Sequence, residues 1–138
     1  MARRSINIEG YNHQNPIPMA CRVGNVIASS VISAVDPETG ATPEAFEDQC
    51  ALLFANIRAI LHTAGATPEH VVKVCFYMPD LSERAVMNRY WLELFPDENS
   101  RPARHAQKQD LPPPRLLSAD FLAIVERRFM SSRYIPRM

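Results

Sequence analysis

Glycine, cysteine and lysine are all scarce in this chain of 138 residues. Four glycines leave no Gly-rich loop of the kind that cradles phosphate groups, so we expect no nucleotide cofactor. Three cysteines are an odd number and share no metal-ligand spacing, which is typical of reduced thiols in a cytoplasmic protein. No apolar run approaches the ~18 residues that cross a bilayer, and the N-terminus lacks the apolar segment of a signal peptide.

The chain also lacks net charge, because fifteen basic residues balance fifteen acidic ones. It therefore has no electrostatic footprint for nucleic acid or for an anionic membrane, and we expect neither as a partner. Only two of the basic residues are lysines, Lys73 and Lys108. Arginine suits the recognition of planar carboxylates better than lysine does, although a GC-rich genome produces the same bias. None of the four histidines pairs at metal-ligand spacing, so we predict no metal site.

Length indicates a single domain over residues 1–138, with an N-terminal strand and loop over 1–15 and a tail over 129–138. The tail is either a loose end or a strap across a neighbouring subunit. An apolar stripe from Phe46 to Leu61 has helical spacing and ends before Gly65. The expected elements are strands at 5–9 and 26–35, a helix at 42–64, a strand at 71–78, a helix at 82–95, and strands at 104–109 and 117–127.

This order of elements predicts an α+β fold in which two helices pack on one face of a mixed β-sheet. The opposite face needs a cover, and a partner subunit is the economical one.

The segment from Arg101 to His105 contains the strongest local feature. Pro102 favours an extended backbone before it, and Ala103 is too small to crowd a neighbour, so Arg104 enters a strand at a fixed angle. A guanidinium held in this way offers a fork of donors that matches a carboxylate. The alternative is a solvated arginine at the start of a strand.

Asp120 is a lone carboxylate in the apolar run from Leu116 to Val125. Buried carboxylates are rare without a partner, and one placed near an arginine can orient or deprotonate a water molecule. The alternative is an edge-strand aspartate that points at solvent.

With these features in place, the chain resembles the Rid family (YjgF-like reactive-intermediate or imine deaminases) over about residues 16–126. The resemblance depends on the order and spacing of several segments. They are Val23–Ser30, Asp36–Gly40, Gln49–Ala66, Val71–Val74, Asn88–Phe95, Arg101–Arg104 and Leu111–Pro112.

The resemblance implies a chorismate-mutase-like (YjgF-like) fold, a homotrimer with a central β-barrel, and sites in clefts between subunits. It also implies hydrolysis of an enamine or imine acid to a keto acid and ammonia, without a cofactor. Arg104 corresponds to the arginine that grips the substrate carboxylate. Asp120 matches the family's glutamate, which positions the attacking water, if one residue is inserted in the Pro-rich turn.

Several site positions depart from the family pattern. The site tyrosine falls on Ile17, the Ser-Gly-Gln segment on Ser30-Val31-Ile32, and the site cysteine on Ala106. We therefore expect a divergent member whose substrate-binding residues are Arg104, Ser30, Ile17, His105 and Ala106.

Among Rid-like proteins, the chain looks most like the 2-aminomuconate deaminases, which implies an unsaturated amino dicarboxylate as substrate. A second carboxylate would need a second cation, from His13, His105 or Arg89. The alternative function is a regulatory protein that binds a keto acid without turning it over, and a third is protein interaction through the tail.

Overall fold

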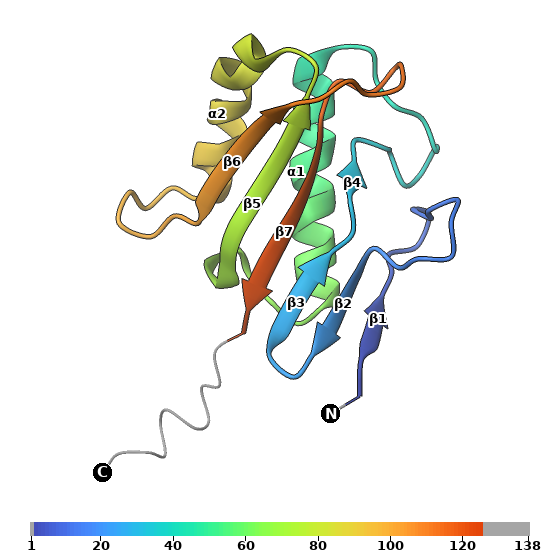
Figure 1. The fold of residues 1–138 in the computed structure, drawn as a ribbon, viewed down its shortest axis with the longest axis vertical. Coiled ribbons are helices and arrows are strands. Elements are labelled where there is room, and N and C mark those ends of the chain that lie inside the picture. Colours follow the sequence, from blue (N-terminus) through green and yellow to red (C-terminus); the bar gives the residue numbers. More distant parts are fainter. Residues whose placement is uncertain (1, 126–138) are drawn as a thin grey trace.

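The computed structural model describes residues 2–125, which form one seven-stranded sheet and two α-helices (Figure 1). The sheet order is β1-β2-β3-β7-β5-β6, and the short β4 also pairs with β7. Only the β5–β6 pair is parallel, so the sheet is mixed, as predicted. The strands are β1 (Arg4–Ile6), β2 (Ala20–Val23), β3 (Val26–Ser29), β4 (Ile32–Ser33), β5 (Val71–Met78), β6 (Ala103–Lys108) and β7 (Ser118–Ile124).

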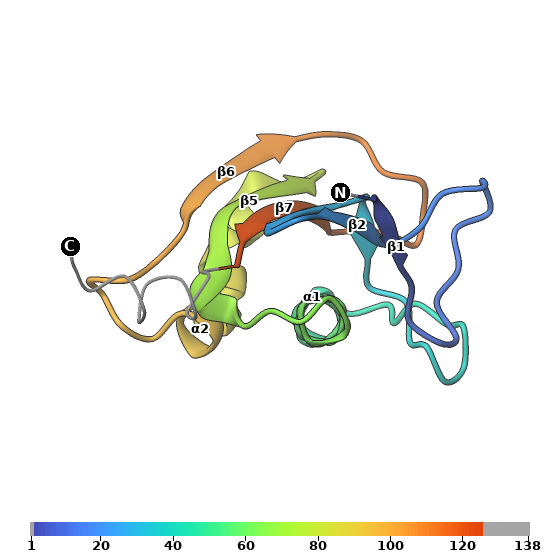
Figure 2. The same cartoon turned by 90° about the horizontal axis from the view of Figure 1, so that it is seen from below.

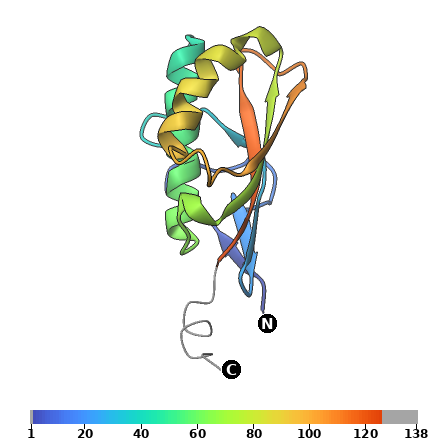
Figure 3. The same cartoon turned by 90° about the vertical axis from the view of Figure 1, so that its left-hand side faces the viewer.

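The helices α1 (Phe46–Thr63) and α2 (Arg84–Leu94) lie on the same face of the sheet (Figures 2 and 3). The predicted fold class is thus confirmed. The predicted stripe of α1 is buried against the sheet, and two short 3-10 turns, η1 (Pro68–His70) and η2 (Leu81–Glu83), precede β5 and α2. The core fills the space between this helical layer and the inward side chains of the strands.

The other face of the sheet is open and apolar. Large side chains on β2, β3 and β7 remain about two-fifths exposed there, at 43% for Val23, 41% for Val26 and 39% for Leu122. Ile124, at the end of β7, is 43% exposed. A sheet face of this composition is usually covered by another layer or another subunit.

Strand β2 was not predicted from the sequence, and β3 and β4 were predicted as one strand. A two-residue turn at Gly24-Asn25 links β2 to β3, and Gly24 has a φ of +59° at its first position, the pattern of a type II′ hairpin. The run predicted over 26–35 breaks at Ser30 because its N–H donates to Met19 O (2.8 Å) and its Oγ donates to Pro18 O (2.8 Å).

Helix boundaries also differ from the predicted ones. Helix α1 begins at Phe46 and not at Thr42. The carbonyl oxygen of Pro43 accepts a hydrogen bond from the side chain of Gln49, in place of the backbone N–H that a helical turn would supply. Strand β7 ends at Ile124, one residue before the end of the described chain, so its predicted extension is wrong at Val125. Residues 126 and 127 of the predicted strand and the tail at 129–138 lie outside the described residues. Within the described residues, no helix is long and apolar enough to cross a membrane.

Candidate functional site

Arg104 is held by helix α2. It lies on β6 opposite Val74 of β5, and its side chain is directed to the helical side of the sheet. Its Nη1 donates to Asn88 Oδ1 at 2.8 Å, and its Cζ lies 5.1 Å from the centre of the Trp91 ring. A hydrogen bond and a cation–π contact from one helix fix the plane of the guanidinium. The fixed angle that was predicted for Arg104 therefore has two anchors that the sequence analysis did not assign to it.

No carboxylate among residues 2–125 balances the charge of Arg104. Burial lowers the pKa of its guanidinium below the usual value, and repulsion from Arg84 lowers it further, although an arginine still remains charged. Among residues 2–125 the one ion pair is Arg89–Glu47, at 2.8 Å. A half-buried cation with free donors and no anionic neighbour favours the binding of an anion.

Asp120 lies on β7 opposite Cys75 and is directed to the open face of the sheet. Tyr77, two residues along β5, donates its hydroxyl to Asp120 Oδ2 at 2.6 Å. This hydrogen bond is the main cause that raises the pKa of Tyr77 to about 12. One carboxylate oxygen is thus fixed by the tyrosine, and Oδ1 has no hydrogen-bond partner among the described residues.

Ser30 and Ile17 lie near the same end of β7 as Asp120. The hydroxyl of Ser30 donates to the carbonyl oxygen of Pro18, which follows Ile17 in the chain. The neighbouring Ser29 Oγ accepts a hydrogen bond from Phe121 N at 2.8 Å. Strand β4 follows directly and pairs Ile32 with Ala119. We call Ile17, Ser30, Tyr77 and Asp120 the carboxylate half-site.

The remaining predicted binding residues, His105 and Ala106, lie on opposite faces of the sheet because neighbouring side chains of a strand alternate between its faces. Ala106 lies on the side of Arg104 and packs against the core, whereas His105 is exposed on the open face, in register with Cys75 and Asp120. Arg89, one of the proposed second cations, is committed to Glu47. We call Arg104, Asn88, Trp91 and Ala106 the arginine half-site.

The structure does not bring Arg104 and Asp120 together within one chain. Arg104 aligns with Val74 and Asp120 with Cys75, and adjacent residues of β5 point to opposite faces of the sheet. Strand β5 also lies between the two strands that bear them. Both residues were predicted to line one cleft between subunits, and the strand register implies that two different chains would have to supply them.

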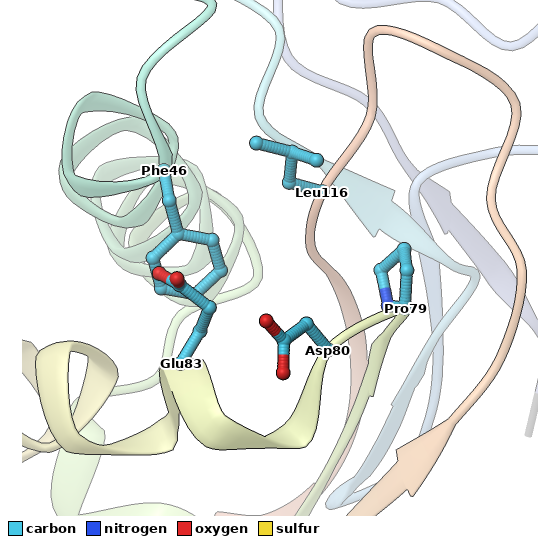
Figure 4. A pocket seen from close by; sticks show the side chains of 5 residues that line it. All are labelled: Phe46, Pro79, Asp80, Glu83 and Leu116. Atoms are coloured by element: carbon cyan, nitrogen blue, oxygen red, sulfur yellow. The ribbon is translucent and has the colours of Figure 1, made fainter.

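A hollow of about 130 Å³ lies elsewhere, between the start of α1 and the turn after β5 (Figure 4). Its lining combines apolar side chains with the carboxylates of Asp80 and Glu83. Asp80 Oδ1 already accepts from the N–H and hydroxyl of Ser82, the first bonds of η2. Two negative side chains repel a carboxylate ligand, so this hollow does not suit the predicted substrate class.

Three residues of the two half-sites were missed by the prediction from sequence. Asn88, Trp91 and Tyr77 were not among the site residues predicted from the sequence. A usable signal was the spacing of Arg84, Asn88 and Trp91 at i, i+4 and i+7, which puts them on one face of a helix. Among residues 2–125, no three His, Cys, Asp or Glu side chains are grouped to hold a metal ion.

Comparison with known proteins gives consistent matches over most of the chain. Residues 11–118 match the family described as endoribonuclease L-PSP. A RutC family protein of Pyrococcus abyssi is 37% identical over 113 residues, which are 80% of this chain and 87% of the relative. A 2-iminobutanoate/2-iminopropanoate deaminase of Salmonella typhimurium is 30% identical over 90 residues, 64% of this chain and 70% of the relative.

The fold has the same relatives. The crystal structure of RidA from an Antarctic Psychrobacter species superposes with a TM-score of 0.81 at 28% identity. The match covers 88% of this chain and 99% of the RidA chain, so nearly all of the RidA chain has its counterpart in this fold.

Proposed function

Because the chain belongs to the endoribonuclease L-PSP (RutC/Rid) family, we propose that it is a cofactor-free hydrolytic deaminase of small enamine or imine carboxylic acids. The products are a keto acid and ammonia. The name of the Salmonella relative supports this reaction class. The observation that carries the proposal is Arg104, a half-buried guanidinium that is oriented by Asn88 and Trp91 and lacks a carboxylate partner among the described residues.

We place the site between subunits of a homotrimer. The arginine half-site and the carboxylate half-site lie on opposite faces of one sheet, so a ligand that touches both must take them from two chains. The exposed apolar face formed by β2, β3 and β7 supports burial against neighbouring copies, in a central barrel of three sheets.

In this mechanism Arg104 holds the substrate carboxylate by two parallel N–H···O bonds. An enamine substrate first shifts a proton to carbon and becomes the imine. Water, oriented by the free oxygen of Asp120, then adds its oxygen to the imine carbon while the nitrogen gains a proton. Collapse of this carbinolamine forms the C=O bond and breaks the C–N bond, which releases ammonia. Orientation of the two reactants supplies most of the rate gain, because each step is already accessible in water.

The residues that we place near the reacting carbon differ from the family pattern in side-chain length and polarity. Asp120 is one methylene shorter than the family glutamate, and the bond from Tyr77 fixes its rotamer toward one side. Ser30 and nearby backbone groups supply a polar wall, while Ile17 and Val31, each 48% exposed, present apolar surface where the family pattern has a tyrosine and a glycine. His105 and Ala106 complete the set of residues that we assign to substrate binding.

Ammonia release from freshly generated imine and enamine acids, 2-aminomuconate among them, tests the proposal. We expect Arg104→Ala to lose the acceleration over buffer, and Arg104→Lys to lose most of it because the fork of donors is absent. Arg58→Ala, an exposed arginine of α1, is the matched control and should behave as wild type. Full turnover by Arg104→Ala would remove the central role of the arginine.

Mixing two inactive variants tests the shared site. Chains with Arg104→Ala and chains with Asp120→Ala, refolded together, should regain up to about one quarter of wild-type activity, because random assembly makes that share of sites intact. A site built within a single chain would regain none.

The altered positions favour one alternative, a regulatory protein that binds a keto acid or another small carboxylate without turnover. Ile17, Val31 and Ala106 stand where the family has a tyrosine, a glycine and a cysteine. Arginine-dependent binding of keto acids, with no acceleration of any deamination, would select this function. In either case we propose a cytoplasmic protein with no nucleic acid partner, since the net charge is zero.

A further inference from the structure

Helix α2 brings a second arginine, Arg84, to the arginine half-site. Residues 84, 88 and 91 share one face of α2, and two of them, Asn88 and Trp91, contact Arg104. Side chains that are four residues apart on a helix are neighbours, so Arg84 lies beside Asn88, one turn closer to the start of α2. The proposed function gives Arg84 no role.

The chain direction places Arg84 level with Ala106 of β6. Helix α2 and strand β6 run in opposite directions, and η2, which leads into α2, contacts β6 (Figure 1). From the contact between Arg104 and Asn88, four residues toward the start of α2 rise about 6 Å. Two residues toward the end of β6 rise about 6.6 Å in the same direction. Arg84 is therefore beside the stretch of β6 from Arg104 to Ala106, where the resemblance to the Rid family puts two site residues.

The two guanidinium groups are close enough to repel each other. Burial lowers the pKa of Arg104, repulsion from Arg84 lowers it further, and no acidic side chain of residues 2–125 counters this shift. Salt screens exposed charges that are more than about 8–10 Å apart, so such a repulsion requires near neighbours. Among residues 2–125, neither arginine has a carboxylate within ion-pair distance.

The contacts of Arg84 leave most of its donors free. Its Nε donates to Leu81 O at 2.9 Å, and its two Nη groups have no acceptor among the described residues. The carboxylate of the preceding Glu83 lies at the hollow beside Phe46 (Figure 4). The first turn of α2 contains no acidic residue, although negative side chains are the ones that stabilise the start of a helix. Two positive charges gathered at a helix start are unfavourable, and a bound anion offsets their repulsion.

We propose that Arg84 is a substrate-binding residue that holds the substrate carboxylate jointly with Arg104. This inference rests on the proposed deaminase function. A carboxylate has about four lone-pair positions on its two oxygens, so it can accept the fork of Arg104 and a further N–H group of Arg84 from the side of Ala106. One carboxylate then lies between two cations, and the substrate needs no second anionic group.

Steady-state kinetics with 2-iminobutanoate, generated in place from 2-aminobutanoate by an amino acid oxidase, test the proposal. We expect Arg84→Gln to raise KM about three- to tenfold and to leave kcat within about twofold, because the carboxylate is held equally in the ground state and in the transition state. Arg84→Lys keeps the charge and should recover most of the affinity. Arg58→Gln removes the same charge from an exposed position of α1 and should match wild type.

Salt dependence gives a readout that a merely structural role would not change. Raising the ionic strength from about 0.01 M to about 1 M shortens the screening length from about 30 Å to about 3 Å. The difference in KM between wild type and Arg84→Gln should therefore shrink as salt is added. A difference that is independent of salt, or a loss confined to kcat, overturns the proposal.

The remaining outcomes separate this inference from the proposed function. If Arg84→Gln has the KM of wild type, or if Arg58→Gln raises KM equally, Arg84 has no role in binding and the deaminase stands. If wild type does not turn over the imine, the deaminase proposal fails, and calorimetric binding of 2-oxobutanoate then decides on Arg84. Weaker binding in Arg84→Gln but not in Arg58→Gln supports its role. Equal binding by all three proteins, or none by wild type, overturns it.

Discussion

Replacement of Gln49 by alanine should destabilise the fold far more than a change at one polar side chain usually does. Gln49 is completely buried on α1. Its Nε2 donates to Pro43 O at 2.7 Å and to Pro114 O at 2.8 Å, and its Oε1 accepts from Leu116 N at 2.9 Å. One amide thus joins the segment before α1 to the Pro-rich turn that leads into β7.

The magnitude follows from what the variant leaves behind. Each of the three hydrogen bonds contributes about 0.5–1.5 kcal/mol net, and the carbonyls lie at partly exposed residues where water can replace the amide in part. The lost packing of the amide stem adds about 1 kcal/mol. We therefore expect the free energy of unfolding to fall by about 3–5 kcal/mol in Gln49→Ala.

Urea unfolding at a fixed chain concentration measures this change, because association would otherwise shift the midpoint. Gln49→Glu separates hydrogen bonding from volume: it keeps the size and the acceptor but removes the donors to both carbonyls when ionised. It should therefore also lose stability at neutral pH. Gln107→Ala, an exposed glutamine of β6, should lie within about 0.5 kcal/mol of wild type. A loss below about 1 kcal/mol in Gln49→Ala would refute the reasoning.

Three further predictions concern other residues. Tyr77→Phe should be less stable than wild type near neutral pH. The folded-state pKa of Tyr77 is raised to about 12, so this contribution is complete below pH ~10 and is lost as the pH rises toward 12, which unfolding curves across that range can follow. Gly10→Ala should lower the thermal midpoint by several degrees, because Gly10 has a φ of +87° and a Cβ would collide with the carbonyl of Pro37. Cys50 should resist thiol reagents in the native protein, because burial raises its pKa to about 12, while the half-buried Cys21 and Cys75 react. Mass spectrometry after brief alkylation can locate the label.

The sequence was informative about the fold wherever a single physical signal dominated. The apolar spacing along α1 predicted its buried face, and the β-rich segments predicted most strands of the sheet. Strand β2 was not predicted because its four residues, Ala20–Val23, include a cysteine and an arginine and show no alternation of polar and apolar side chains. Arg22 makes a tertiary contact that no local sequence pattern reveals. Its Nη1 donates a hydrogen bond to Ala64 O, at the end of α1, at 2.6 Å.

The candidate site was predictable in part. Arg104 and Asp120 could be chosen from chemistry and resemblance, but their placement on opposite faces depends on the register of β5 with both neighbours. Register follows from the assembled sheet and is not encoded in either segment alone. For the same reason the bond between Tyr77 and Asp120, 43 residues apart, could not be foreseen.

The separation of the two half-sites has a consequence for how such proteins diverge. The guanidinium and its anchors lie on β6 and α2, whereas Ile17 and Ser30 belong to the N-terminal third of the chain. Under the proposed function, mutations in that third can change which molecules are accepted without disturbing Arg104, which binds the carboxylate that all substrates share. Where two paralogues of this fold are made in one cell, mixed assemblies would combine the anchor of one with the selectivity of the other, giving sites that neither gene encodes alone.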